Sequence, residues 1–172
     1  MPNWCMNDVT LCNEDVSKVD ALEEHLKKVD DQSNEEAEGF ADFLRPNPDG
    51  EWNYGWSCEN WGTKWDPSPE FWTRNDENSI TIVFDSAWSP PTELYEYLIE
   101  EEGGSWDVTA MYYEPGMAFT GSYDNGIQEH YDIDFEDDNW RDEIPEDLIE
   151  FAGLDDEYEN WKEWQEDESE MD

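Results

Sequence analysis

The sequence has few basic residues. Only eight of its 172 residues are Lys or Arg, against 49 Asp and Glu, so the formal net charge is −41. A polyanion cannot release the counterions that drive nucleic-acid binding, and anionic membranes repel it too. We therefore expect neither direct binding to nucleic acid nor binding to a membrane.

Long apolar runs and cysteines are scarce as well. No stretch of 18 apolar residues is present, so the sequence predicts no transmembrane helix. The first residues do not combine a basic region with an apolar run, so we expect no secretory signal. The three cysteines, Cys5, Cys12 and Cys58, suit a reducing cytoplasm better than a disulfide scaffold. We expect a cytoplasmic protein whose thiols are free and buried.

The sequence offers little material for catalysis. Its two histidines are His25, expected on the solvated side of a helix, and His130, expected in a strand, and no spacing pairs either with a cysteine. It contains neither a phosphate loop nor a Gly-rich dinucleotide fingerprint. We predict no catalytic residue, no cofactor and no enzyme activity.

One acidic segment has the spacing of a calcium loop. Positions 1, 3, 5, 7 and 12 of that template are filled by Asp132, Asp134, Glu136, Asp138 and Glu143. The sixth position, where the sharp turn needs Gly, is Asp137. Chance matches are common in so acidic a chain, so we predict no dedicated metal site and only weak attraction of divalent cations to the negative field.

Aromatic side chains, in contrast, are abundant. The sequence has 26 Phe, Tyr and Trp residues, 11 of them Trp. Disordered acidic chains are poor in aromatics, so we expect a folded domain that tolerates strong self-repulsion. Residues 50–78 contain five Trp and look like an insertion packed by its own aromatics, or alternatively a surface on which a ligand stacks. Lys64, between Trp61 and Trp65, is placed for a cation–π contact.

The hydrophobic pattern predicts an α+β fold. Helical spacing occurs over 16–29 and after the Pro90-Pro91 pair, where Ser89 is the expected N-cap. Phe40, Phe43 and Leu44 indicate a short helical turn, preceded by an acidic link over 30–38. The expected strands are 4–11, 79–84, 106–113, 117–123 and 128–135. This order predicts an antiparallel sheet with two helices on one face, close to the split βαβ pattern.

The last part of the chain differs from the rest. Leu148, Phe151, Leu154, Tyr158, Trp161 and Trp164 recur at spacings of mostly three and four, which predicts one or two short helices with a narrow aromatic stripe. We therefore divide the chain into an α+β domain over 1–143, including the Trp-rich insertion 50–78, and an acidic helical extension over 144–172.

Four short motifs, in this order, suggest a family. They are Met-Pro-Asn-Trp-Cys at 1–5, Trp-Gly-Thr-Lys-Trp-Asp at 61–66, Phe-Asp-Ser-Ala-Trp-Ser-Pro-Pro at 84–91, and Tyr-Glu-Pro-Gly at 113–116 leading to Phe-Thr-Gly at 119–121. Residues 1–126 thereby resemble the YubB-type ferredoxin-like domain family of phages and plasmids.

The resemblance implies a ferredoxin-like α/β plait and a mobile element acting in the cytoplasm of a bacterial host cell. It implies no functional residue, and the acidic C-terminal extension departs from it. The family's name concerns topology, because three cysteines cannot supply the four thiolates of an iron–sulfur cluster.

The negative charge is unevenly distributed. Residues 1–88 hold 20 acidic and six basic side chains, whereas residues 89–172 hold 29 and two. A compact chain of 20.3 kDa exposes about 8,800 Å², so the average charge density is about half that of B-DNA. A face that collects the C-terminal excess approaches the density of the duplex. A halophile-like solvated surface is the alternative, although it explains neither the Trp content nor the asymmetry.

The sequence therefore favours a non-enzymatic, phage-encoded inhibitor that mimics nucleic acid. Its expected partner is a host nucleic-acid-binding protein, such as a restriction enzyme, a CRISPR effector, another nuclease or RNA polymerase. Tyr158, Trp161 and Trp164 either dock their helix on the domain or anchor it in the partner. The carboxylates expected to stand in for phosphates are Asp132, Asp134, Glu136, Asp137, Asp138, Asp142, Glu143, Asp155, Asp156, Glu157, Glu159, Glu163, Glu166 and Asp167.

Two other functions remain open at this stage. One is a small-ligand or divalent-metal-binding module that uses the Trp-rich insertion and the acidic cluster. The other is a virion or scaffold component whose charge maintains solubility.

Overall fold

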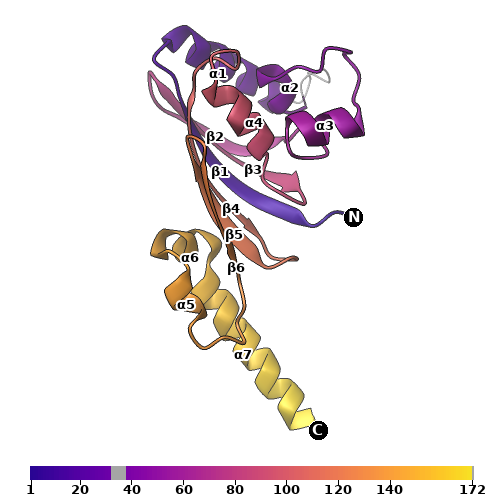
Figure 1. Ribbon diagram of the computed structural model, residues 1–172, viewed down its shortest axis with the longest axis vertical. Coiled ribbons are helices and arrows are strands. Elements are labelled where there is room, and N and C mark those ends of the chain that lie inside the picture. Colours follow the sequence, from indigo (N-terminus) through magenta and orange to yellow (C-terminus); the bar gives the residue numbers. More distant parts are fainter. Residues whose placement is uncertain (32–37, 172) are drawn as a thin grey trace.

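The computed structural model describes residues 1–31 and 38–171 (Figure 1), so most of the acidic link expected over 30–38 lies outside the described residues. Within them, the chain forms an α+β structure around a six-stranded antiparallel sheet in the order β2-β3-β1-β4-β5-β6. The strands are β1 (Trp4–Cys12), β2 (Pro69–Asp76), β3 (Ser79–Ala87), β4 (Asp107–Glu114), β5 (Phe119–Asp124) and β6 (Ile127–Asp132).

Helices cover both faces of the sheet, at opposite ends of the molecule (Figure 1). In the described part of the chain, none of them is both long and apolar enough to cross a membrane. The helices are α1 (Val16–Asp30), α2 (Ala41–Leu44), α3 (Tyr54–Asn60), α4 (Thr92–Ile99), α5 (Trp140–Glu143), α6 (Glu146–Ala152) and α7 (Leu154–Met171).

The main core lies between the sheet and helices α1 and α4. Val9 of the central strand β1 is buried beside Ile82 of β3 and Ala110 of β4, its partners in the register, whereas Thr10 points to the other face. Alternation along the strand therefore divides apolar from polar side chains as expected. The same cluster contains the apolar stripes of α1 and α4, which are Val19, Leu22, Leu26, Leu94, Tyr95 and Leu98.

The N-termini of α1 and α4 differ in their capping. Asp15 caps α1, because its carboxylate accepts a hydrogen bond of 3.0 Å from the amide of Ser17. The expectation that Ser89 caps α4 is wrong. The helix begins at Thr92, and the hydroxyl of Ser89 instead donates to the carbonyl of Gly62 at 2.9 Å. Ser89 is thus used to hold the Trp-rich segment.

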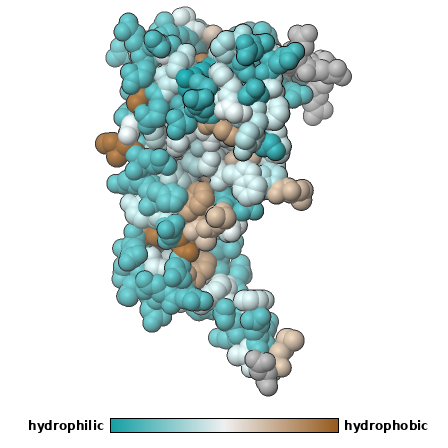
Figure 2. All heavy atoms as spheres, turned by 45° about the vertical axis from the view of Figure 1, so that its right-hand side comes forward, coloured by the Kyte–Doolittle hydropathy of each residue, from teal (hydrophilic) through white to brown (hydrophobic). Residues whose placement is uncertain are grey.

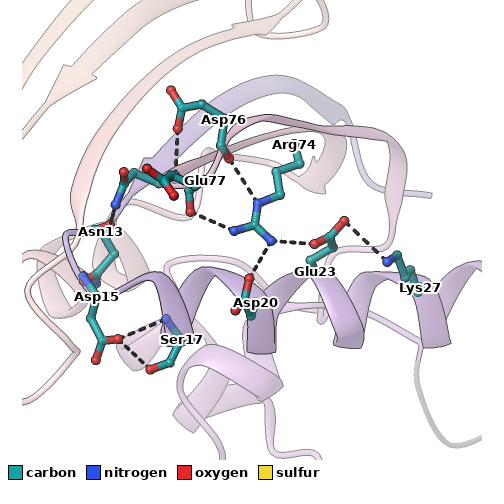
Figure 3. Close-up of polar contacts among 10 residues, drawn as sticks. Asn13, Asp15, Ser17, Asp20, Glu23, Lys27, Arg74, Asp76 and Glu77 are labelled. Carbon is teal, nitrogen blue, oxygen red and sulfur yellow. Dashed lines mark hydrogen bonds and ion pairs between the residues drawn. The ribbon is translucent and has the colours of Figure 1, made fainter.

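Residues 50–78 are not a separate insertion packed only by their own aromatics. Their second half is β2, an edge strand of the main sheet that pairs with β3. Arg74 ties this edge to α1, since its Nη1 lies 2.7 Å from a carboxylate oxygen of Asp20 and 2.6 Å from one of Glu23 (Figure 3). Its other nitrogens donate to the carbonyls of Asp76 and Glu77.

The second core lies on the opposite face of the sheet, under α5, α6 and α7. Met111 and Tyr113 of β4 point to this face, one residue out of phase with the side chains of the main core. They pack against the buried residues Trp140, Ile144, Leu148, Ile149, Ala152 and Leu154. Within the described residues of the extension over 144–172, the chain forms two helices, α6 and α7, as expected, but α7 is not short: it has 18 residues and projects away from the sheet (Figure 1).

Candidate functional site

Helices α5, α6 and α7, with the segment after β6, form a C-terminal layer on one face of the sheet. This layer brings the acidic segment over 132–143 next to the acidic helix α7. Phe135, in the segment after β6, contacts Tyr158 and Trp161 of α7, with ring centroids 5.5 and 6.1 Å apart. Trp140 of α5 completes the aromatic cluster, 5.3 Å from Tyr158. The acidic segment over 132–143 therefore lies beside α7.

The aromatic residues of α7 have different environments. Tyr158 and Trp161 are partly buried and stack on each other with ring centroids 5.9 Å apart, so they form the docking stripe. Trp164 is 57% exposed. Of the two roles expected for the three side chains, docking thus describes the first two, and Trp164 remains accessible to a partner.

The carboxylates expected to contact a partner are accessible. All of them are exposed except Asp137, which is partly buried. Asp134 and Asp137 also shape their own turns, since each accepts a hydrogen bond from the amide two residues further on. In residues 1–31 and 38–171, no three acidic, His or Cys side chains are arranged to hold a metal ion, and this includes the segment with calcium-loop spacing.

The carboxylates of α7 form a stripe on the side away from the sheet. At 100° per residue, seven of them fall within an arc of about 120°, opposite Tyr158 and Trp161. We call this set the acidic stripe; it consists of Asp155, Asp156, Glu159, Glu163, Glu166, Asp167 and Glu170.

Two basic residues partly neutralise one end of the acidic stripe. Arg141 binds Asp155 at 2.9 Å and Glu146 at 2.7 Å, and its hydrogen bonds lower the pKa of the Glu146 carboxyl. Lys162 binds Glu159 at 2.8 Å, which raises the pKa of the lysine. Beyond Lys162, α7 carries only acidic charges, so the negative potential is highest toward its C-terminal end.

A second candidate site lies at the other end of the molecule, in the Trp-rich segment. A hollow of about 500 Å³ is bordered by Trp52, Trp61 and Trp65. A smaller one, of about 320 Å³, adjoins it and shares Trp65 and Asp66. In the smaller hollow Asp85 raises the pKa of the neighbouring Glu70 carboxyl. The sequence pointed to this segment by its Trp content, but it did not single out Asp66 or Glu70.

Lys64 makes the expected cation–π contact, with its Nζ 4.4 Å from the centre of the Trp65 ring. His25 is not on a solvated surface as expected. Its Nε2 lies 2.7 Å from the carbonyl of Gly39, and its ring stacks on Phe43 at 4.3 Å. The short helix α2 folds back on α1 and covers this histidine.

The cysteines are free, but only one of them is buried. Cys5 lies in the sheet, and burial raises the pKa of its thiol to about 12. Cys12 and Cys58 are partly exposed, so the expectation of three buried thiols is wrong for these two. Cys12 ends strand β1 and Cys58 lies on the short helix α3, and both positions leave part of the side chain open to solvent.

Comparisons with known proteins add one structural likeness. No protein-family model matches the chain, and no curated protein matches it. Among solved structures, it is similar to a protein api92 from Yersinia pseudotuberculosis, described by the family model DUF1281, with 11% sequence identity and a TM-score of 0.44. The similarity covers 76% of this chain and 98% of that one.

Proposed function

We propose that this protein is a non-enzymatic, phage-encoded inhibitor that mimics nucleic acid and blocks the DNA- or RNA-binding surface of a host defence protein or nuclease. The acidic stripe carries the proposal. From Asp155 to Glu170 its seven carboxylates span about 22 Å of helix, an average of one per ~3.8 Å, which is close to the one charge per ~3.4 Å of helix axis on one strand of B-DNA. A basic groove shaped for phosphates would thus meet a similar density of charge along its length.

The placement of the stripe supports the same function. The helix projects from the body of the protein, so it can enter a groove that the sheet cannot (Figure 1). The accessible surface of 10,280 Å² exceeds the ~8,800 Å² of a compact chain of this mass, as expected for a projecting element. Trp164 borders the stripe and would supply an aromatic anchor.

We propose that β1 to β4 with α1 and α4 form a ferredoxin-like plait of the YubB type, to which β5, β6 and the C-terminal helices are added. The strand order β2-β3-β1-β4 and the two helices on one face support it. Such a family would place the protein in the cytoplasm of a bacterial host.

The test uses the full chain as bait in a bacterial lysate, followed by competition with duplex DNA. We expect capture of a nucleic-acid-binding protein at low salt, and its release both by high salt and by DNA. Failure to capture any such protein, or a captured partner that still binds DNA in a ternary complex, would contradict the proposal.

A matched pair of double variants makes the test specific. Glu163→Gln/Glu166→Gln removes two charges from the acidic stripe, and we expect it to weaken binding to the partner about tenfold or more. The control Glu150→Gln/Glu168→Gln removes two exposed charges that lie outside the stripe, one on α6 and one on α7. Equal losses in both would show that overall charge, and not the stripe, governs binding.

A further inference from the structure

The larger hollow in the Trp-rich segment has the size of a small-molecule site. Its volume of about 500 Å³ lies within the ~300–1,000 Å³ usual for ligand-binding clefts. It is far from the acidic stripe, because α3 and the loops beside it occupy the opposite end of the molecule from α7 (Figure 1). Figure 2 shows that most of the visible surface is hydrophilic, with hydrophobic groups in small separate patches.

The walls of the hollow present aromatic rings and few free donors. Trp52 is 56% exposed, and its indole N–H already donates to the carbonyl of Lys64 at 2.9 Å. The indole N–H of the buried Trp61 donates to the carbonyl of Arg45 at 3.0 Å. Trp65 is 39% exposed. Both indole N–H groups are thus satisfied. Because Trp61 is only 3% exposed and forms the floor of the hollow, the aromatic surface open to a ligand comes from Trp52 and Trp65.

The rest of the lining is acidic. Asp42, Glu51 and Asp66 border the hollow, and its described lining contains no Lys or Arg. Asp66 is held in place because its Oδ1 accepts a hydrogen bond of 2.7 Å from the amide of Ala41. Burial raises the pKa of this carboxyl to about 7, so a cation in the hollow would favour its ionised form.

Aromatic faces combined with carboxylates select a particular kind of ligand. The negative electrostatic potential of an aromatic face attracts cations, and weakly hydrated cations lose least on leaving water. Trp65 already binds an ammonium group in this way, that of Lys64. We propose that the hollow between Trp52, Trp61 and Trp65 binds a small organic cation with an alkylated ammonium head group.

The decisive comparison is between choline and its neutral isostere 3,3-dimethylbutan-1-ol. Each is titrated into the full chain at 0.15 M NaCl, with calorimetry and Trp fluorescence as readouts. We expect choline to bind at least about tenfold more tightly than the alcohol, because only choline carries the charge. Equal affinities, or no binding of choline, would overturn the proposal. A peptide containing trimethyllysine is titrated in parallel: tighter binding than choline assigns the site to a modified protein, and weaker binding to a free small molecule.

Variants distinguish binding in the hollow from the general attraction of cations to a chain of charge −41. Trp52→Ala and Glu51→Gln should each weaken choline binding, the first by about tenfold. Trp164→Ala removes a ring of nearly the same exposure, 57%, at the other end of the molecule and should have no effect. If Trp52→Ala and Trp164→Ala weaken choline binding equally, the proposal that choline binds in the hollow is overturned. Glu51→Gln removes only an exposed charge, so it keeps the test valid if Trp52→Ala perturbs the fold.

Discussion

The guanidinium group of Arg141 binds the carboxylate of Asp155 through two hydrogen bonds, with Nε and Nη2 2.9 and 3.0 Å from its two oxygens. Asp155 is the second residue of α7, so this pair ties the start of the projecting helix to α5. It also joins one of the few basic residues of the C-terminal layer to the end of the acidic stripe.

The first prediction concerns this pair. Arg141→Gln should loosen the first turns of α7, because a planar two-bond contact is lost and two carboxylates are left without their cation. We expect faster amide hydrogen exchange over residues 155–160. Lys162→Gln removes the same charge, but its contact with Glu159 lies within the helix, and this control should change exchange less. Equal effects would mean that only net charge matters.

The second prediction concerns the core beneath the helices. Trp140 is 5% exposed and packs against Phe135 and Tyr158. Trp140→Ala should therefore lower the free energy of unfolding by about 3–5 kcal/mol, through lost burial and the cavity that remains. Urea unfolding followed by circular dichroism measures it. Trp164→Ala, at an exposed position, should stay within about 0.5 kcal/mol of the parent, and a similar loss in both variants would contradict the packing described.

The third prediction follows from the raised pKa of Asp66. A carboxyl with a pKa of about 7 in the folded state, against an ordinary value of 3.8, binds more protons folded than unfolded between these values. The free energy of unfolding therefore falls as the pH rises through this window. Backbone amides of Ala41 and Asp42 oppose the shift, whereas Asp42 and Glu38 add to the effect of burial.

Asp66→Asn removes this proton uptake and keeps an oxygen that can accept the hydrogen bond from Ala41. We expect the variant to match the parent near pH 4 and to exceed its stability at pH 8 by up to about 4 kcal/mol, the value of a shift of about three pKa units. Thermal unfolding across pH 4–8 measures the difference. Asp49→Asn, a nearby exposed position, controls for the loss of one negative charge. If Asp66→Asn is no more stable than this control at pH 8, the pKa of the Asp66 carboxyl is not raised as described.

The fourth prediction concerns the edge strand. Arg74 connects β2 with Asp20 and Glu23 of α1 (Figure 3). Arg74→Gln cannot span both carboxylates, so the amides of 71–75 should exchange faster while those of the central strand β1 are unchanged. Lys28→Gln, an exposed position on α1, provides the charge-matched control. Unchanged exchange over 71–75 would show that pairing with β3 alone holds the edge.

Local patterns were sufficient for the elements with a strong amphipathic period. The helix expected over 16–29 is observed as Val16–Asp30, and the strand expected over 4–11 as Trp4–Cys12. Both bury one face against many neighbours, so their apolar residues recur with the period of the element. β2 gives no such signal, because its side chains are mostly exposed and its pairing contains irregularities near Pro69 and Asp76. The segment is a strand because it pairs with β3.

The candidate sites divide in a similar way. The aromatic stripe of 158, 161 and 164 was visible in the sequence, yet docking and exposure could be assigned only once Phe135 and Trp140 were placed against it. The hollow in the Trp-rich segment depends on contacts between distant residues, such as the hydrogen bond from the amide of Ala41 to Asp66. No spacing rule predicts such a contact.

The sequence by itself determined the sign of the charge, its excess in the second half and the α+β class, because composition and period follow directly from residue order. Helical periodicity places the carboxylates of the acidic stripe on one side of α7, but the tertiary structure alone decided where that side points, since the docking of Tyr158 and Trp161 orients α7 and turns the acidic stripe toward solvent. The hollow around Trp52 also depends on the tertiary structure, because its walls come from segments that meet only when the chain folds. Charge is thus a property of the chain, whereas its presentation to a partner is a property of the fold.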